Sequence, residues 1–264
     1  MRLFKKHKFG LVLSGGGVRG FAHLGAIKAL LENNIKPGII SGTSAGAIVG
    51  AFIADGFSPD DVMKLFKEIK LSSIVKVTLP RSGFFRLNKF KEFLDHNLRS
   101  KTFEELSIPL YVAATNYTTG HIHYFHQGSI TDKLIASASV PVLFTPEQID
   151  GHYFIDGGVV DNLPVAPIFN KCRKKIGIYV NPLAAEHDCS NLLKISERFF
   201  HIAIANEVQQ NRQYFDLYIE PLELKAYSMM DLNKMEDIFK IGYDEMSQLL
   251  VNKKSLLKQI FEKL

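Results

Sequence analysis

A run of glycines between an apolar segment and a helical pattern is the feature that most limits what this chain can fold into. Residues 9–14 have the composition of a short buried strand, the sequence GGGVRG occupies 15–20, and apolar residues then recur with helical spacing over 21–33. Backbone N–H groups at such a turn are not shielded by side chains, and the helix dipole favours negative charge beside them. A tight turn alone would need only one or two glycines. The longer glycine run therefore predicts a site for a phosphate or an oxyanion.

The alternation of strand and helix patterns continues along the chain. Further strands are expected at 39–41, 108–116, 121–126, 175–180 and 215–219, and further helices at 45–55, 59–69, 88–98, 131–139, 190–211 and 231–264. A short turn joins 108–116 to 121–126, which predicts a β-hairpin. The stretch after Pro141 is interpreted as rich in turns. This order predicts an α/β fold of three layers, α/β/α, with a mostly parallel central sheet.

Composition limits the classes of protein to which the chain can belong. Its 264 residues are 46% apolar and contain no linker-like tract, so a single domain over 1–264 is expected. The net charge of +5 is mild and its basic residues are mostly scattered, so nucleic acid is not an expected partner. The two cysteines lack zinc or disulfide spacing, and no acidic metal loop is present, so no metal or cofactor is expected.

The N-terminal residues and one uncharged segment bear on where the protein is located. The apolar run at 9–13 is too short for the core of a signal peptide, so a cytoplasmic location is expected, with membrane association left open. Residues 37–54 carry no charge and have glycines four residues apart, as some spanning helices do. Pro37 and several hydroxyl residues in the first half argue against a span and favour a strand, a sharp turn and a helix. The oligomeric state is left open.

That sharp turn carries a second motif, Gly42-Thr43-Ser44-Ala45-Gly46. The pattern Gly-x-Ser-x-Gly between a strand and a helix is typical of a nucleophile elbow, in which the serine hydroxyl is exposed on a strained turn. The glycine loop before it could supply donors for an oxyanion. The same loop also fits a dinucleotide fingerprint, but the second strand lacks the acid that would hold a ribose. A dinucleotide-binding oxidoreductase is therefore the alternative that explains this loop but not the second motif.

A serine nucleophile needs a base, and the histidines are poor candidates. His187 and His201 lack a distinguishing context, and His23 could either approach Ser44 or pack the first helix. The alternating histidines His121, His123 and His126 are typical of a solvated hairpin face. A better candidate is Asp156, which follows the apolar end of a strand and precedes Gly157 and Gly158. Taken alone, this pattern favours an ordinary Asp-Gly-Gly turn.

The glycine loop, the elbow and Asp156-Gly157-Gly158, in that order, resemble the motifs of bacterial members of the patatin-like phospholipase family. Residues 136–141 (ASASVP) and 156–164 (DGGVVDNLP) resemble two further stretches of that family. The resemblance covers about 9–182, and no motif covers 190–264. One departure is Ser14, where plant members have Asp.

The resemblance implies a lipid acyl hydrolase that needs neither a catalytic histidine nor a cofactor. Ser44 would be the nucleophile, Asp156 the general base, and the N–H groups of Gly15, Gly16 and Gly17 the oxyanion hole. The supporting residues would be Arg19, Gly20, Gly42, Gly46, Gly157 and Gly158. Arg19 would hold the loop or meet a head-group anion, with ordinary surface pairing as the alternative. The expected partner is a lipid or acyl-ester substrate such as a (lyso)phospholipid, and a non-catalytic lipid-binding descendant of the family is the alternative.

Two further segments bear on contact with lipid. Residues 71–87 combine apolar and basic side chains and could border the site and touch lipid, or form a buried connector. The lysines after residue 231 are more typical of a solvated helix face than of a membrane anchor.

Overall fold

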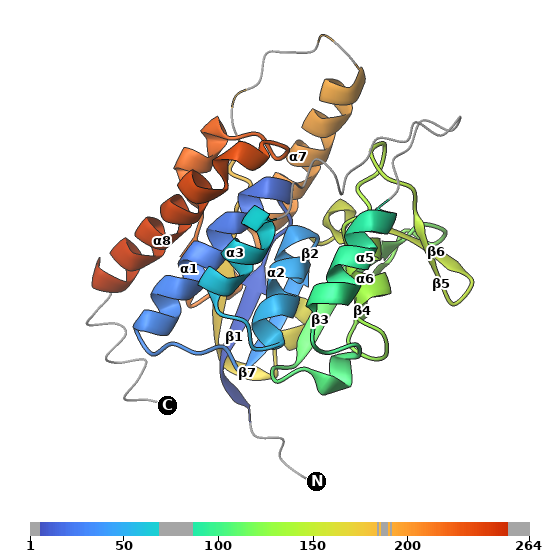
Figure 1. Ribbon diagram of the computed structural model, residues 1–264. Coiled ribbons are helices and arrows are strands. Elements are labelled where there is room, and N and C mark those ends of the chain that lie inside the picture. The colour runs from blue at the N-terminus through green and yellow to red at the C-terminus, as the bar shows by residue number, and fades with distance from the viewer. Residues whose placement is uncertain (1–5, 69–86, 184, 186–189, 191, 253–264) are drawn as a thin grey trace.

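The structure is a computed structural model that describes residues 6–68, 87–183, 185, 190 and 192–252 (Figure 1). Its strands are β1 (His7–Leu13), β2 (Ile39–Thr43), β3 (Leu110–Asn116), β4 (Ile122–Phe125), β5 (Glu147–Ile149), β6 (His152–Asp156), β7 (Cys172–Ile178) and β8 (Leu217–Ile219). Its α-helices are α1 (Phe21–Glu32), α2 (Ala45–Ala54), α3 (Pro59–Glu68), α5 (Asn88–Asn97), α6 (Thr131–Ser137), α7 (Leu192–Asn211) and α8 (Met235–Asn252).

The strands form one 8-stranded sheet in the order β5-β6-β3-β2-β1-β7-β8, with β4 also paired to β3. The strands β3, β2, β1, β7 and β8 run parallel, whereas β4 and β6 run antiparallel to β3 and β5 runs antiparallel to β6. The expected α/β fold with a mostly parallel sheet is confirmed, and so is the hairpin of β3 and β4.

The strands β5 and β6 correct the interpretation of the stretch after Pro141 as turns. They form a hairpin across Asp150 and Gly151, which both have positive φ, at 50° and 81°. Turns with two positive φ values match the twist of paired strands. The two strands are short and lie among turn residues, so their periodicity is too brief to be recognised in the sequence.

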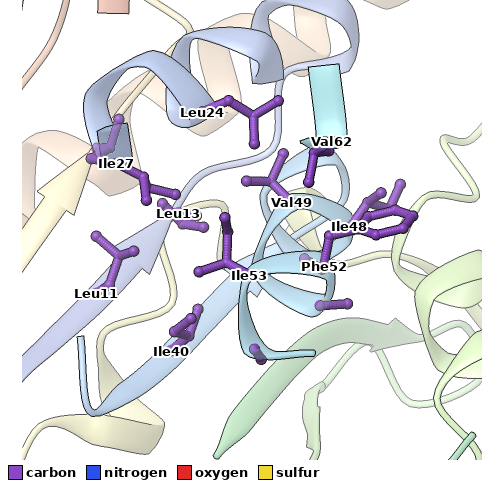
Figure 2. Packing of buried hydrophobic residues seen from close by; sticks show 14 of the residues in the cluster. Leu11, Leu13, Leu24, Ile27, Ile40, Ile48, Val49, Phe52, Ile53 and Val62 are labelled. Carbon is purple, nitrogen blue, oxygen red and sulfur yellow. The ribbon is translucent and has the colours of Figure 1, made fainter. Parts of the chain in front are cut away.

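The sheet separates two apolar layers. Leu11 and Leu13 of β1 belong to a large cluster with α1, α2 and α3, while the intervening Val12 belongs to a second cluster with Ile204 and Val208 of α7. Figure 1 shows the first group of helices together on one face of the sheet. Figure 2 shows the larger cluster at close range, where strand residues meet residues of α1 and α2: Leu11, Leu13, Ile40, Leu24, Ile27, Val49 and Ile53.

The helix α8 packs directly on α1, as Figure 1 also shows. A Cβ atom at Gly25 would overlap the carbonyl of Phe239, and one at Gly242 would overlap the carbonyl of Ala22. Glycine is therefore needed at both positions, because each helix backbone lies against the other. Within the described part of the chain, no helix combines the length and the apolar composition of a membrane span.

Candidate active site

The strand β3 brings Ser44 and Asp156 together. Thr43, the last residue of β2, aligns with Ala113, and Asp156, the last residue of β6, aligns with the next residue of β3, Ala114. Ser44 follows Thr43 directly, so the nucleophile candidate and the base candidate flank neighbouring positions of β3, which lies between β2 and β6. The carboxyl ends of parallel strands are where α/β sheets place their sites.

The backbone at Ser44 has the strained conformation of a nucleophile elbow. Its φ and ψ are 51° and −121°, which a non-glycine residue adopts only where its surroundings impose them. The Ser44 N–H donates to Ser137 Oγ at 2.8 Å, and that hydroxyl donates to the carbonyl of Ala113 at 2.6 Å. A Cβ atom at Gly46 would lie 2.5 Å from the carbonyl oxygen of Ser14. The turn is thus fixed by a buried hydroxyl on one side and by close backbone contact on the other.

Asp156 is a buried carboxyl group that contacts Ser44. Its side chain accepts the N–H of Gly158 at 2.7 Å and lies beside the Ser44 side chain. Only 1% of the residue is exposed, and this burial raises the pKa of Asp156 from 3.8 to about 7, against the interactions with Ser44 and Gly158, which lower it. A carboxyl with such a pKa accepts a proton far more readily than an ordinary aspartate.

The glycine loop is adjacent to Ser44, since a Cβ atom at Gly15 would lie 3.2 Å from Ser44 Cβ. The Gly15 N–H donates to Asn162 Oδ1 at 3.1 Å, so this donor is engaged within the protein and is not free for an oxyanion, contrary to the prediction for Gly15. Among the described residues, none accepts a hydrogen bond from the N–H of Gly16 or Gly17. Both glycines line the cavity described below.

Arg19 is buried, and its Nε donates to the carbonyl of Tyr227 at 2.8 Å. The N–H of the neighbouring Val18 donates to the carbonyl of Met229 at 2.8 Å. The alternative that Arg19 forms an ordinary ion pair on the protein surface is therefore wrong. The residue ties the glycine loop to the segment before α8, a part of the chain that no motif in the sequence had connected with the site.

The histidines have other roles. His23 is fully buried, and its Nε2 donates to the carbonyl of Ser14 at 2.8 Å, while burial lowers its pKa to about 4. It therefore packs the first helix, one of the two expected alternatives. His201 contacts the sulfur of Met229, and His121, His123 and His126 are exposed on and beside the β4 hairpin, as expected. His187 lies outside the described residues.

A cavity of about 220 Å³ opens above Ser44. Aliphatic and aromatic side chains form most of its wall, and Asp156 is the only ionisable group among the described residues that line it. Residues of the first core cluster also form part of this wall, namely Leu24, Ile48, Val49 and Val62, which Figure 2 labels. Of the segment 71–87, only Leu87 is described, and it lines the cavity.

Three polar residues of the site had no predicted role: Ser137, Asn162 and Asn181. Each is buried, and each bonds the backbone of the elbow or of the glycine loop. Asn181 comes shortly after β7, where a polar residue at the carboxyl end of a parallel strand is a signal for a site. Asn162 and Ser137 lie inside motifs that the sequence displays, but their partners depend on tertiary contacts.

Several known proteins are similar to this chain in sequence. The lysophospholipase NTE1 of Kluyveromyces lactis is 27% identical over 270 residues, which cover 89% of this chain and 18% of that protein. The patatin-like phospholipase domain-containing protein 7 of Rattus norvegicus is 26% identical over 279 residues, covering 92% of this chain and 20% of that protein. An NTE family protein of Mycobacterium tuberculosis is 33% identical over 161 residues, 60% of this chain and 44% of that protein. The chain thus spans less than half of each of these relatives.

Solved structures share the fold. VipD from Legionella pneumophila superposes with a TM-score of 0.61 at 19% identity, covering 94% of this chain and 67% of VipD. ExoU from Pseudomonas aeruginosa, in its complex with SpcU, superposes with a TM-score of 0.52 at 15% identity, covering 94% of this chain and 53% of the other. Residues 11–169 match the family described as patatin-like phospholipase. This chain therefore belongs to the patatin-like phospholipase family.

Proposed function

We propose that this chain is a serine acyl hydrolase that cleaves ester bonds of lipids through a Ser44–Asp156 dyad and an acyl-enzyme intermediate. The observation that carries the proposal is that Ser44, on a strained turn, and the buried Asp156 lie beside each other in the wall of one apolar cavity. A serine with a neighbouring buried carboxyl is the arrangement expected of a nucleophile and its base.

In the first half-reaction, ionised Asp156 takes the proton from Ser44 Oγ as that oxygen attacks the ester carbonyl carbon. The N–H groups of Gly16 and Gly17 would stabilise the oxyanion of the tetrahedral intermediate, backed by the helical turn that begins at Gly17. Collapse of the intermediate expels the alcohol, which takes the proton from Asp156. The acyl group is then bonded to Ser44 Oγ.

In the second half-reaction, Asp156 takes a proton from a water molecule that attacks the acyl-Ser44 ester. The oxyanion forms again in the same place, and the carboxylic acid leaves as Ser44 recovers the proton. A base whose pKa lies near the working pH serves both directions of proton transfer, because it accepts and releases a proton at small cost.

The cavity wall supports a lipid as the substrate. An apolar cavity with a single ionisable group can stabilise an acyl chain by burial, at roughly 0.8 kcal/mol for each methylene group removed from water. A phosphate or other charged head group would find no cationic side chain among the described lining residues, so we place the head group outside the cavity. The lysophospholipase name of the yeast relative fits a substrate of this class, a (lyso)phospholipid.

The proposal is tested by turnover of short p-nitrophenyl esters and of a lysophospholipid by the wild type and by Ser44→Ala and Asp156→Asn. We expect each variant to lose nearly all activity while its circular dichroism spectrum stays that of the wild type. Asp161→Asn is the matched control, because Asp161 is also buried but accepts from the hydroxyl of Tyr124 at 2.6 Å. Retained turnover in Ser44→Ala or Asp156→Asn would exclude the dyad.

A further inference from the structure

The carbonyl of Gly15 accepts two hydrogen bonds from buried side chains. Asn181 Nδ2 donates to this oxygen at 2.7 Å, and Ser14 Oγ donates to it at 3.0 Å. Ser14 is fully buried and Asn181 is 5% exposed, so water competes little with either bond. A backbone carbonyl bound by two donors on one side has a fixed direction.

The direction of this carbonyl also fixes the next N–H group. In a trans peptide, the C=O of one residue and the N–H of the following residue lie in one plane and point in opposite directions. The Gly15 carbonyl is held toward Ser14 and Asn181, so the Gly16 N–H must point away from them. Gly16 lines the cavity above Ser44, and its N–H is not bonded to any residue that the structure describes.

The two donors are themselves held in place. The N–H of Val180 donates to Ser14 Oγ at 3.0 Å, which leaves the hydroxyl proton to point at Gly15. The parallel pairing of β1 with β7 aligns Leu13 with Ile178, so residues 14–15 necessarily run beside residues 179–181. The absence of a side chain at Gly16 completes the fit, because a Cβ atom there would lie 2.5 Å from Val180 Cγ2 and 2.9 Å from Asn181 Oδ1.

We propose that Ser14 and Asn181 are positioning residues for the oxyanion hole, which act by clamping the Gly15–Gly16 peptide so that the Gly16 N–H faces the reacting carbonyl. This inference rests on the proposed function. The clamp adds no charge and acts through the Gly16 N–H, so its effect through the oxyanion hole falls on the transition state, where the oxyanion is present.

The test compares wild type with Asn181→Leu and Ser14→Ala. Leucine has nearly the shape of asparagine without the donor, and alanine removes the hydroxyl alone. We expect about a tenfold or greater fall in kcat in each variant with little change in KM, somewhat less than the loss on deleting an oxyanion donor outright. Binding of an alkyl trifluoromethyl ketone, which forms a tetrahedral adduct with a serine, should weaken by a similar factor. Binding of a non-hydrolysable ether lipid should change less than twofold in Ser14→Ala, because the described residues that line the cavity include Asn181 but not Ser14.

Asn33→Leu is the matched control, because Asn33 Nδ2 also donates to a backbone carbonyl, that of Ala29 at 2.9 Å, far from the cavity. It should change kcat less than twofold. If Asn181→Leu does not fold, Ser14→Ala carries the same comparison. If the ketone and the ether lipid lose affinity equally, or if kcat is unchanged in folded variants, the clamp is wrong, but the proposed hydrolase activity is not affected. Wild-type protein that turns over no ester and forms no ketone adduct would overturn the hydrolase, and the clamp with it.

Discussion

Ser44 and Asp156 lie beside each other because β2 and β6, the strands that precede or contain them, both pair with β3. The contact thus depends on the register of a mixed sheet. β2 runs parallel to β3 and β6 runs antiparallel to it, so their ends converge on Ala113 and Ala114 from opposite directions. The short β5–β6 hairpin is therefore what delivers the base to the nucleophile.

The pH dependence of catalysis follows from the raised pKa of Asp156. The base must be ionised in the free enzyme, so kcat/KM should fall about tenfold per pH unit below an inflection near pH 7, and should level off above it. The measurement is the initial rate of fatty acid release from a lysophospholipid. Asp161 also has a raised pKa, of about 6, so Asp161→Asn should keep the inflection near pH 7. A flat profile between about pH 5 and 8 would contradict this assignment.

Asp156 should also lower the stability of the folded protein at high pH. Its folded-state pKa is raised, so the native state binds more protons than the unfolded state between about pH 4 and 7, and stability falls as the pH rises through this window. Asp156→Asn removes that cost. We expect the variant to be more stable than wild type at pH 8 by roughly 1 to 4 kcal/mol, with the difference shrinking toward pH 4. Urea unfolding at the two pH values measures it, and a less stable variant at pH 8 would contradict the expectation.

Ser137 should support both stability and catalysis. Ser137→Ala leaves the buried Ser44 N–H without its acceptor, which costs about 1 to 3 kcal/mol, and frees the elbow to shift. We expect kcat to fall about tenfold. Ser139→Ala is the control, because the Ser139 hydroxyl donates to the backbone carbonyl of Ile135 at 2.8 Å and does not bond the turn at Ser44. If both variants lose the same activity, Ser137 has no special role in holding Ser44.

Two glycines of α2 should differ in their tolerance of alanine. A Cβ atom at Gly46 would lie against the backbone carbonyls of Leu13 and Ser14, which cannot move without displacing β1. Gly46→Ala should cost about 3 kcal/mol or more, or prevent folding. A Cβ atom at Gly50 would meet only side chains, at 3.0 Å from Ile40 Cγ2, and helix propensity offsets that crowding. Gly50→Ala should therefore stay within about 1 kcal/mol of wild type in thermal unfolding, and equal losses would contradict the role of Gly46.

The sequence predicted the parts of the fold that rest on long or regular patterns. Strand and helix alternation gave the parallel core and the β3–β4 hairpin, because these segments are long enough to display their period. The hairpin of β5 and β6 was missed because β5 has three residues and its neighbours are turn formers. The segment 71–87, which suggested contact with lipid, lies outside the described residues except for Leu87.

The candidate site was predictable where chemistry is carried by local motifs, as at Ser44 and Asp156. The roles of Asn162 and Asn181 could not be predicted in this way. Each bonds Gly15 through a contact between residues that are distant in sequence. Asn181 reaches Gly15 because β1 and β7 lie side by side, and Asn162 reaches it from the loop after β6. The Gly15 N–H was assigned wrongly to the oxyanion hole for the same reason, since its acceptor comes from the loop after β6.

Labelling with a fluorophosphonate probe, followed by mass spectrometry of the modified peptide, tests the central claim most directly. Such probes modify serines that an adjacent base has activated, so the experiment requires no knowledge of the natural lipid. We predict that the wild type and Asp161→Asn are labelled at Ser44 and that Ser44→Ala and Asp156→Asn are not. A folded wild-type chain that stays unlabelled, or a Ser44→Ala variant that is labelled at the wild-type rate, would contradict the Ser44–Asp156 dyad.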